Sequence, residues 1–192
     1  APSPSAIWAG LPSDAELDAA YADAASDDYV DEEAGQRETA RRMLARIERH
    51  APGRGAILDL GCWVGFLLAE AQDRGWTATG VEPSAFAAGY ARDRFGIEVR
   101  NEGLLDAELP ARAYDAIFLG DVIEHLVDPA AALERIAGLL APGGVLVMAL
   151  PDAGSRLARR LGRRWWAVLP THVQYFSRGS MRALLEREGY TP

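Results

Sequence analysis

The chain has 192 residues, of which 49% are hydrophobic and 25% are charged, a balance that is typical of one globular domain and excludes a disordered chain. It contains neither an apolar run of about 18 residues nor the basic start and apolar centre of a signal peptide, so we expect no stable membrane insertion and no secretion. The formal charge of −8 disfavours nucleic-acid binding. Cys62 is the single cysteine, which excludes a disulfide framework, so we expect a cytoplasmic protein.

The first predicted segment of the chain is an N-terminal arm. Residues 1–33 are predicted to form this arm together with an acidic helix at residues 14–28, as a partial lid. Residues 34–50 are predicted to be a helix, because apolar residues recur every three or four positions. Short apolar runs and helical patterns then alternate. The predicted strands are residues 56–60, 77–81, 97–100, 114–119 and 145–150, and the predicted helices are residues 66–74, 85–95, 129–140 and 177–189.

This alternation predicts an α/β fold in which a doubly wound, mostly parallel sheet is covered by helices on both faces. Residues 34–192 then form one domain. Ligands of such sheets bind at the carboxyl ends of the strands, beside the point where the strand order reverses. Functional residues are therefore expected where the strands end.

The end of the first strand carries an acid and two glycines, Asp59, Gly61 and Gly65. Glycine allows a sharp turn and a close approach of the backbone to a ligand. A dinucleotide site needs a third glycine, and the charge of Asp59 repels a pyrophosphate. The turn therefore favours a ligand with a positively charged centre.

The end of the second strand carries Glu82, which follows Gly61 by 21 residues. An acid at about this distance commonly accepts hydrogen bonds from ribose hydroxyls, in NAD and adenosyl ligands alike. The alternative is that Glu82 only favours the start of the following helix.

Four segments together resemble the class I S-adenosylmethionine-dependent methyltransferases, and in particular the small-molecule branch that includes ubiquinone-biosynthesis-type O-methyltransferases. They have the order and spacing of that family. The segments are residues 57–65 (ILDLGCWVG), 80–84 (GVEPS), 114–129 (YDAIFLGDVIEHLVDP) and 139–144 (LLAPGG).

The resemblance implies that S-adenosylmethionine is the cofactor and assigns its binding residues. The methionine part is expected at the first turn, the ribose at the end of the second strand, the adenine beside residues 104–106, and the opposite side of the cofactor at the end of the fourth strand. The residues concerned are Asp59, Gly61, Cys62, Gly65, Glu82, Pro83, Ser84, Leu104, Asp106, Gly120, Asp121 and Val122.

The chain departs from the family pattern in three places. Trp63 stands where the family usually has glycine, which requires either an ordinary or a strained backbone there. Gly103 stands where the family commonly has an aspartate near the adenine, and Asp106 is the candidate substitute. The family's sheet usually has seven strands, and the sequence accounts for five, so the last two are expected to be lacking.

The acceptor side is predicted from histidines and from residues 151–176, which the resemblance makes an insertion near the acceptor. A hydroxyl acceptor needs a base, and His125 and His172 are the candidates, each with a structural role as the alternative. Tyr29 and Tyr175 are candidate substrate contacts, the first closing over the cofactor. The histidines and acids are too few and too scattered in the sequence to predict a metal site, so none is expected.

Five arginines, at positions 156, 159, 160, 163 and 164, recur at the spacing of one helix face. Arg160 and Arg164 are taken as candidate contacts to an anionic or carrier-bound acceptor. A solvated face, contact with anionic lipid, and an internal clasp with the acidic residues 27–33 are the alternatives.

The sequence therefore predicts an S-adenosylmethionine-dependent methyltransferase that acts on a small molecule, with a hydroxyl oxygen as the expected acceptor. Two alternatives stay open. One is a nicotinamide-dependent oxidoreductase, which the missing third glycine disfavours. The other is a non-catalytic adenosyl-binding module.

Overall fold

The protein, seen in a computed structural model, is described here over residues 33–192. Five strands, all parallel, form one sheet in the order β3-β2-β1-β4-β5. The strands are β1 (Ala56–Leu60), β2 (Thr77–Val81), β3 (Glu98–Arg100), β4 (Tyr114–Gly120) and β5 (Leu140–Ala149). This is the doubly wound α/β fold expected from the alternation of strands and helices. In the described part of the chain, β5 is an edge strand.

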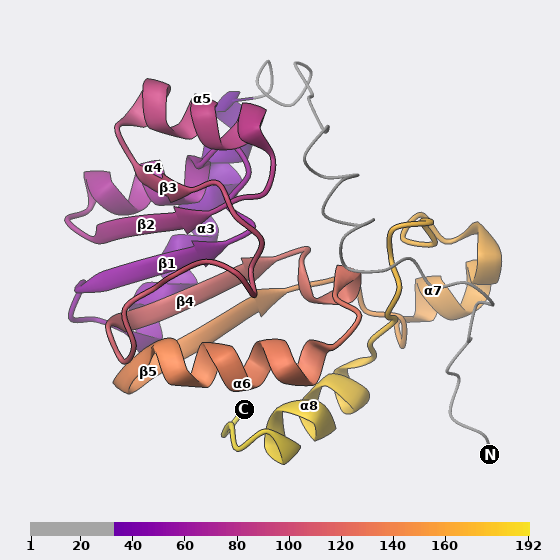
Figure 1. Cartoon of the computed structure of the whole chain (residues 1–192). Helices are drawn as coiled ribbons and strands as arrows, with labels where there is room; N and C mark the ends of the chain where they lie inside the picture. Colours follow the sequence, from indigo (N-terminus) through magenta and orange to yellow (C-terminus); the bar gives the residue numbers. More distant parts are fainter. Residues whose placement is uncertain (1–32) are drawn as a thin grey trace.

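Helices cover both faces of the sheet (Figure 1). One core lies between the sheet and α3 (Glu33–His50), α4 (Phe66–Asp73) and α5 (Ala85–Phe95). The other lies between the sheet and α6 (Pro129–Leu139) and α8 (Arg178–Arg187). Successive side chains of a strand point to opposite faces, so Ile57 joins the first core and Leu58 the second.

Local sequence explains where most of these helices begin. Ser84 Oγ accepts a hydrogen bond from the Ala87 amide, and Asp128 Oδ1 accepts from the Ala130 and Ala131 amides. Ser177 and Ser180 form a reciprocal capping box at the start of α8, as expected for a serine at this position. Such caps satisfy amides that have no partner within the helix.

Two predictions about these elements are wrong. β5 begins at Leu140 rather than at residue 145, because Leu140 pairs with Tyr114 and the ladder resumes, after a register shift, at Ala116 and Val145. The prediction that one helix carries all five arginines is also wrong. α7 (Arg156–Leu161) ends before Gly162, which has a positive φ of 53°. A 3₁₀ turn, η2 (Gly162–Arg164), follows it. The five arginines therefore do not share one helix face.

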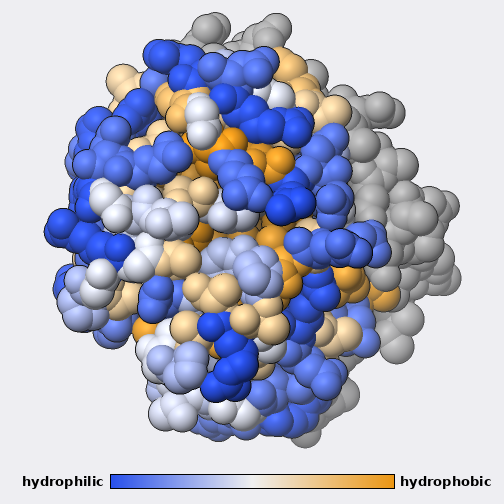
Figure 2. Space-filling view, turned by 60° about the vertical axis from the view of Figure 1, so that its left-hand side comes forward, coloured by the Kyte–Doolittle hydropathy of each residue, from blue (hydrophilic) through white to orange (hydrophobic). Residues whose placement is uncertain are grey.

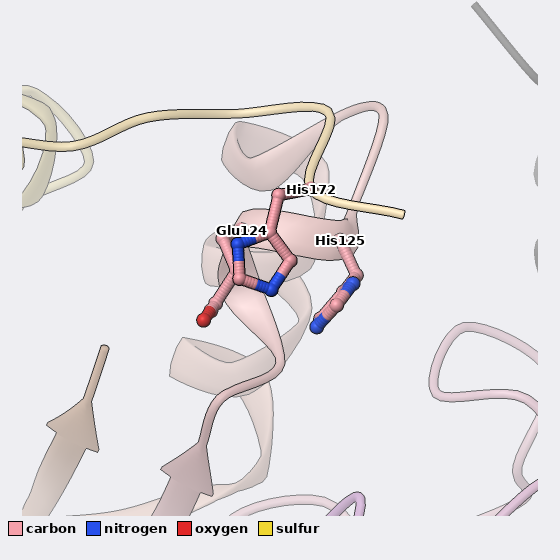
Figure 3. Close-up of side chains that lie close together, drawn as sticks. All are labelled: Glu124, His125 and His172. Carbon is pink, nitrogen blue, oxygen red and sulfur yellow. The ribbon is translucent and has the colours of Figure 1, made fainter. Parts of the chain in front are cut away.

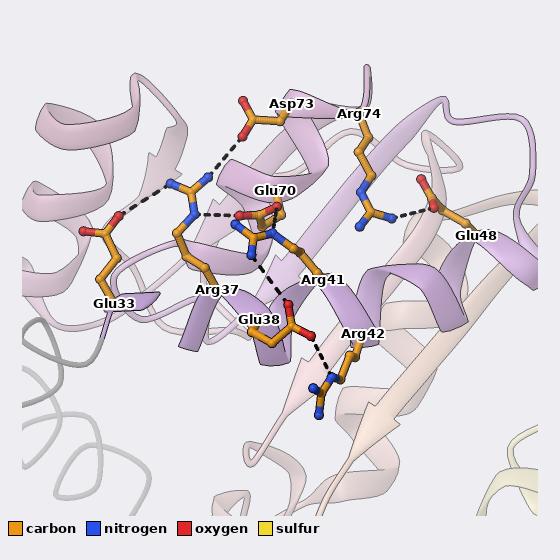
Figure 4. A network of polar contacts seen from close by, with 9 residues as sticks. All are labelled: Glu33, Arg37, Glu38, Arg41, Arg42, Glu48, Glu70, Asp73 and Arg74. Carbon is orange, nitrogen blue, oxygen red and sulfur yellow. Dashed lines mark hydrogen bonds and ion pairs between the residues drawn. The ribbon is translucent and has the colours of Figure 1, made fainter. Parts of the chain in front are cut away.

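Ion pairs dock α3 onto α4 (Figure 4). Glu70 of α4 is only 5% exposed and accepts hydrogen bonds from Arg37 Nε at 2.6 Å and Arg41 Nε at 3.0 Å. Burial alone raises the pKa of Glu70, but these hydrogen bonds outweigh it and the pKa is lowered. A buried carboxylate with two guanidinium partners fixes the position of α3 beside the first strand-to-helix turn.

The strand order reverses between β1 and β4, so the carboxyl ends of these strands form the switch point of the sheet. α7 lies beyond the carboxyl ends of β4 and β5 (Figure 1). The face seen in Figure 2 is largely hydrophilic, with apolar residues gathered near its centre. None of the helices described here is both long and apolar enough to cross a membrane.

Gly80 of β2 provides a test of this packing. A Cβ atom at position 80 would lie 2.5 Å from Cys62 Sγ and 3.0 Å from Leu68 Cδ1, both in buried side chains. We expect Gly80→Ala to lower the free energy of unfolding by about 1–3 kcal/mol, measured by urea denaturation. Gly89→Ala on α5 is the matched control, because no atom lies within 4 Å of its added Cβ. Equal stability of the two variants would contradict the close approach of β2 to the Cys62 turn.

Candidate cofactor and acceptor site

The turn after β1 is held by hydrogen bonds from the Gly61 and Cys62 amides to the Val81 carbonyl, at 2.8 and 3.1 Å. Gly61 has a φ of 79°, and a Cβ at this position would lie 2.5 Å from Val122 Cγ2. Glycine is therefore required both by the backbone conformation and by the contact with the segment after β4. The turn brings the ends of β1, β2 and β4 together.

Trp63 has a φ of 48°, in the left-handed region that glycine adopts freely. Of the two backbone states that the sequence left open, the structure has the strained one, at a cost of about 1–2 kcal/mol. Its amide donates a hydrogen bond to Glu82 Oε2 at 2.8 Å. The strained turn is thus held by the acid at the end of the neighbouring strand.

Glu82 is 4% exposed, and both of its carboxylate oxygens accept backbone hydrogen bonds. Oε2 accepts from Trp63 and Oε1 accepts from the Ser84 amide, each at 2.8 Å. Burial raises the pKa of Glu82, although these two bonds act in the opposite direction. The two amides fix the orientation of the carboxylate, and each oxygen keeps a further lone pair.

Asp59 is buried without a complete set of partners. It is 3% exposed, and its Oδ1 has no hydrogen-bond partner among the described residues. Burial, together with the charge of Glu82, raises the pKa of Asp59 to about 8. A positively charged ligand beside Asp59 would offset both effects, which fits the amino group and sulfonium of S-adenosylmethionine.

A cavity of about 260 Å³ lies over this turn, between α3 and the ends of β1, β4 and β5. Six of the predicted cofactor residues line it, together with Trp63 and with α3 side chains such as Gln36 and Met43. The six are Asp59, Gly61, Cys62, Gly65, Gly120 and Asp121.

The other predicted cofactor residues lie around this cavity rather than in its lining. Val122 contacts the Gly61 backbone, and Ser84 caps α5. Pro83 presents its carbonyl to Asn101 Nδ2 at 2.8 Å, and the same amide donates to the Glu82 carbonyl at 2.9 Å. Asn101 was not predicted from the sequence, since a lone asparagine after a short strand gives no distinguishing signal.

The predicted adenine segment, residues 104–106, is a turn beside the second core. Leu104 packs partly buried against that core, whereas Asp106 is exposed. Arg135 of α6 holds the segment, with hydrogen bonds from Nε to the Leu104 carbonyl at 3.2 Å and from Nη2 to the Ala107 carbonyl. Sequence reasoning missed Arg135, because an arginine in a helix is usually read as a solvated residue.

Two distant segments meet beyond β4. Glu124 and His125 lie in the 3₁₀ turn η1 (Ile123–His125), and His172 lies in the loop before α8. His125 Nδ1 donates to the Thr171 carbonyl at 2.9 Å, and the Gln174 amide donates to the Glu124 carbonyl at 2.9 Å. The two imidazole rings lie 4.6 Å apart at 84° (Figure 3).

Burial controls the charge of this cluster. Burial lowers the pKa of His125 and of His172, and for His125 the hydrogen bond from the ring to the Thr171 carbonyl opposes this effect only in part. Burial also raises the pKa of Glu124 to about 7. Both imidazoles are therefore neutral at pH 7 and each keeps a lone pair. The expectation that histidines and acids are scattered is wrong for this part of the fold.

The predicted substrate contacts have different positions. Tyr175 is half-buried, with its ring 6.4 Å from that of His172. Arg160 and Arg164 are exposed, and neither forms an ion pair with any residue in 33–192. Tyr29 lies outside the described residues, as do the predicted acidic helix and the predicted arm up to residue 32.

Comparison with known proteins identifies relatives of the chain. A family model described as a methyltransferase domain matches residues 33–192. The chain is 34% identical to a ubiquinone biosynthesis O-methyltransferase of Caulobacter sp., covering 77% of this chain and 66% of the relative. It is 35% identical to a trans-aconitate 2-methyltransferase of Methylobacterium radiotolerans, covering 65% and 48%. The chain thus spans about half to two thirds of the length of its curated relatives.

Solved structures share the fold. An S-adenosylmethionine-dependent methyltransferase of Archaeoglobus fulgidus has a TM-score of 0.68 at 22% identity, covering 85% of this chain and 74% of that one. A phosphoethanolamine N-methyltransferase of Haemonchus contortus, solved with S-adenosyl-L-methionine, has a TM-score of 0.63 at 18% identity, covering 78% and 36%. At these identities the likeness concerns the fold.

The raised pKa of Asp59 predicts a pH-dependent stability. The folded protein keeps a proton on Asp59 up to about pH 8, whereas an unfolded aspartate loses it near pH 3.9, so the folded state binds more protons in between. This contribution makes the ligand-free protein less stable as the pH rises from about 4 to 8. Asp59→Asn should remove this pH-dependent contribution. The free energy of unfolding of the variant, relative to that of the unchanged protein, should therefore be greater at pH 8 than at pH 5.

Urea unfolding of both proteins at the two pH values measures this difference. The exposed Asp93→Asn serves as the control and should not alter the pH dependence. If the unchanged protein and Asp59→Asn lose the same stability between pH 5 and pH 8, Asp59 does not hold the proton.

Proposed function

This chain belongs to the S-adenosylmethionine-dependent methyltransferases, and we propose that it transfers the cofactor's methyl group to a hydroxyl oxygen of a small molecule. The observation that carries the proposal is the pair of buried acids, Asp59 and Glu82, beside the cavity at the switch point of the sheet. Methyl transfer is a displacement at an already reactive sulfonium carbon, so holding cofactor and acceptor in line supplies much of the acceleration.

The acids suit the two ends of this cofactor. Asp59, which lacks a full set of partners, matches the positively charged methionine part beside the turn from Gly61 to Gly65. Glu82, oriented by two amides, matches the vicinal hydroxyls of the ribose. We assign the loop held by Arg135 to the adenine.

A nicotinamide-dependent oxidoreductase is the competing function. Glu82 suits a ribose in either case, but the turn distinguishes the two. The turn has only two of the three glycines that a pyrophosphate-binding turn uses, and a bound anion would further disfavour ionisation of the buried Asp59, whereas a cation would favour it. The methyltransferase assignment is therefore favoured.

On the acceptor side, we propose that residues 151–176 form one wall of the site, opposite Gly120 and Asp121. Tyr175 stands next to His172 and suits contact with an apolar part of the acceptor. Arg160 and Arg164 have no ion-pair partner among residues 33–192, so they are available to an acidic group. We accordingly propose an anionic or carrier-bound acceptor.

Removal of the hydroxyl proton is assigned to the histidines beyond β4. His125 and His172 are neutral because burial lowers the pKa of each, and a neutral imidazole can accept a proton. The name of the Caulobacter relative, an O-methyltransferase, supports oxygen as the acceptor atom.

Cofactor binding tests the first part of the proposal. In calorimetric titration we expect S-adenosylmethionine and its demethylated product to bind, and NAD not to bind. Glu82→Gln should weaken binding of both sulfur ligands at least about tenfold, because its NH₂ group faces a backbone amide and cannot accept hydrogen bonds there.

Glu98→Gln is the control, since Glu98 is an exposed acid on the neighbouring strand β3 and should leave the affinity unchanged. Binding of NAD without either sulfur ligand would refute the methyltransferase assignment. Unchanged affinity in Glu82→Gln would remove Glu82 from the ribose role.

Turnover tests the histidines. Methylated product should be sought by mass spectrometry with hydroxylated carboxylates and phosphorylated alcohols as acceptors. For an acceptor that is methylated, His125→Gln or His172→Gln should lower kcat by about 10²–10⁴-fold if the residue removes the proton. For a phenolic acceptor the effect should lessen at high pH, where the hydroxyl ionises without a base. A variant with normal kcat at neutral pH excludes that histidine as the base.

A further inference from the structure

Three metal-ligating side chains converge beyond the carboxyl end of β4. One possible ligand atom from each of Glu124, His125 and His172 lies within 4.8 Å of the other two. Figure 3 shows the three side chains together, two from the η1 turn and one from the loop before α8. Backbone hydrogen bonds from His125 Nδ1 to Thr171 and from Gln174 to Glu124 hold the two segments in contact.

The carboxylate of Glu124 supplies an independent observation. Its side chain is 2% exposed, and among the described residues neither carboxylate oxygen has a hydrogen-bond partner. A buried carboxylate without partners is rare in native proteins, because desolvation is not compensated. A cation held between Glu124 and the imidazoles would satisfy it.

The His125 imidazole is oriented as metal-ligating histidines commonly are. His125 donates its Nδ1 proton to the Thr171 carbonyl, so in the neutral ring Nε2 carries no proton. A backbone carbonyl that receives one ring proton fixes the tautomer and orientation of the ring. The His172 ring is buried and lies 4.6 Å from the His125 ring.

We propose that Glu124, His125 and His172 bind one divalent transition-metal cation of the Zn²⁺ or Mn²⁺ type. Two imidazole nitrogens and one carboxylate oxygen suit such ions, whereas Mg²⁺ and Ca²⁺ prefer oxygen ligands throughout. Ligands of one tetrahedral ion lie about 3.3 Å apart, so small side-chain rotations complete the site. Three protein ligands leave a coordination position open.

The site adjoins the cofactor cavity through Asp121, which lines that cavity and whose charge acts on both Glu124 and His172. One consequence rests on the proposed function. Imidazoles that coordinate a cation cannot accept the acceptor's proton, so the role of His125 and His172 as bases would apply to the metal-free protein. In the metal-bound protein, a cation that binds the hydroxyl would lower the pKa of that hydroxyl instead.

The experiment uses the full chain after treatment with a chelator, with Co²⁺ as the probe because its visible absorption reports nitrogen and oxygen coordination. We expect saturable binding of one Co²⁺ per chain, and displacement of Co²⁺ by Zn²⁺. Glu124→Gln and His172→Gln should each weaken binding at least about tenfold. The control is His50→Gln, at the exposed end of α3, and it should bind as the unchanged protein does.

Absence of saturable binding overturns the proposal, and so does equal affinity of Glu124→Gln and the unchanged protein. Circular dichroism of each variant establishes that it is folded, and Glu124→Gln is nearly the same size as the residue it replaces. No acceptor or cofactor is needed for the measurement, so its failure is distinguishable from failure of the proposed methyl transfer, which calorimetry with S-adenosylmethionine tests separately.

Discussion

The bidentate role of Glu82 is the interaction on which the rest of the site depends. Its carboxylate joins the amide of Trp63, in the turn after β1, to the amide of Ser84, at the start of α5. One side chain thereby fixes the relative position of two strand ends and holds a left-handed, non-glycine residue in place. Gly61 and Gly65 of this turn line the cavity. A carboxylate that orients the backbone in this way is also oriented itself, as the proposed contact with two ribose hydroxyls would require.

Much of this fold follows from local sequence. The strands at residues 56–60 and 77–81 and the helix at residues 85–95 were predicted with the bounds that the structure has. Apolar runs, glycine turns and serine caps determine such elements independently of the remainder of the chain. The start of β5 depends instead on pairing with Tyr114, and periodicity does not reveal a ladder partner. The arginine spacing suggested one helix, but the conformation of Gly162 interrupts it.

The site was predictable to a similar degree. Motifs that follow a strand in sequence, such as the turn from Asp59 to Gly65, could be recognised because each motif lies within one segment. The cluster around Glu124 could not be recognised in this way, because His172 lies 47 residues after His125 in the sequence. His172 is placed beside His125 by the irregular loop before α8. Asn101 and Arg135 act on backbone carbonyls. Such contacts depend on where the backbone lies and leave no pattern in the residue order.

The acids along the carboxyl edge of the sheet have a consequence for the life of the protein in a cell. Burial raises the pKa of Asp59, Glu82, Asp121 and Glu124, and for Asp59 and Glu124 a neighbouring carboxylate adds to the effect. A ligand that offsets the cost of burying these acids would bind the folded chain and not the unfolded one. Occupancy and resistance to unfolding are thereby linked. Loss of such a ligand would raise the population of open states that proteases cleave, so ligand supply would influence how long each copy of the protein lasts.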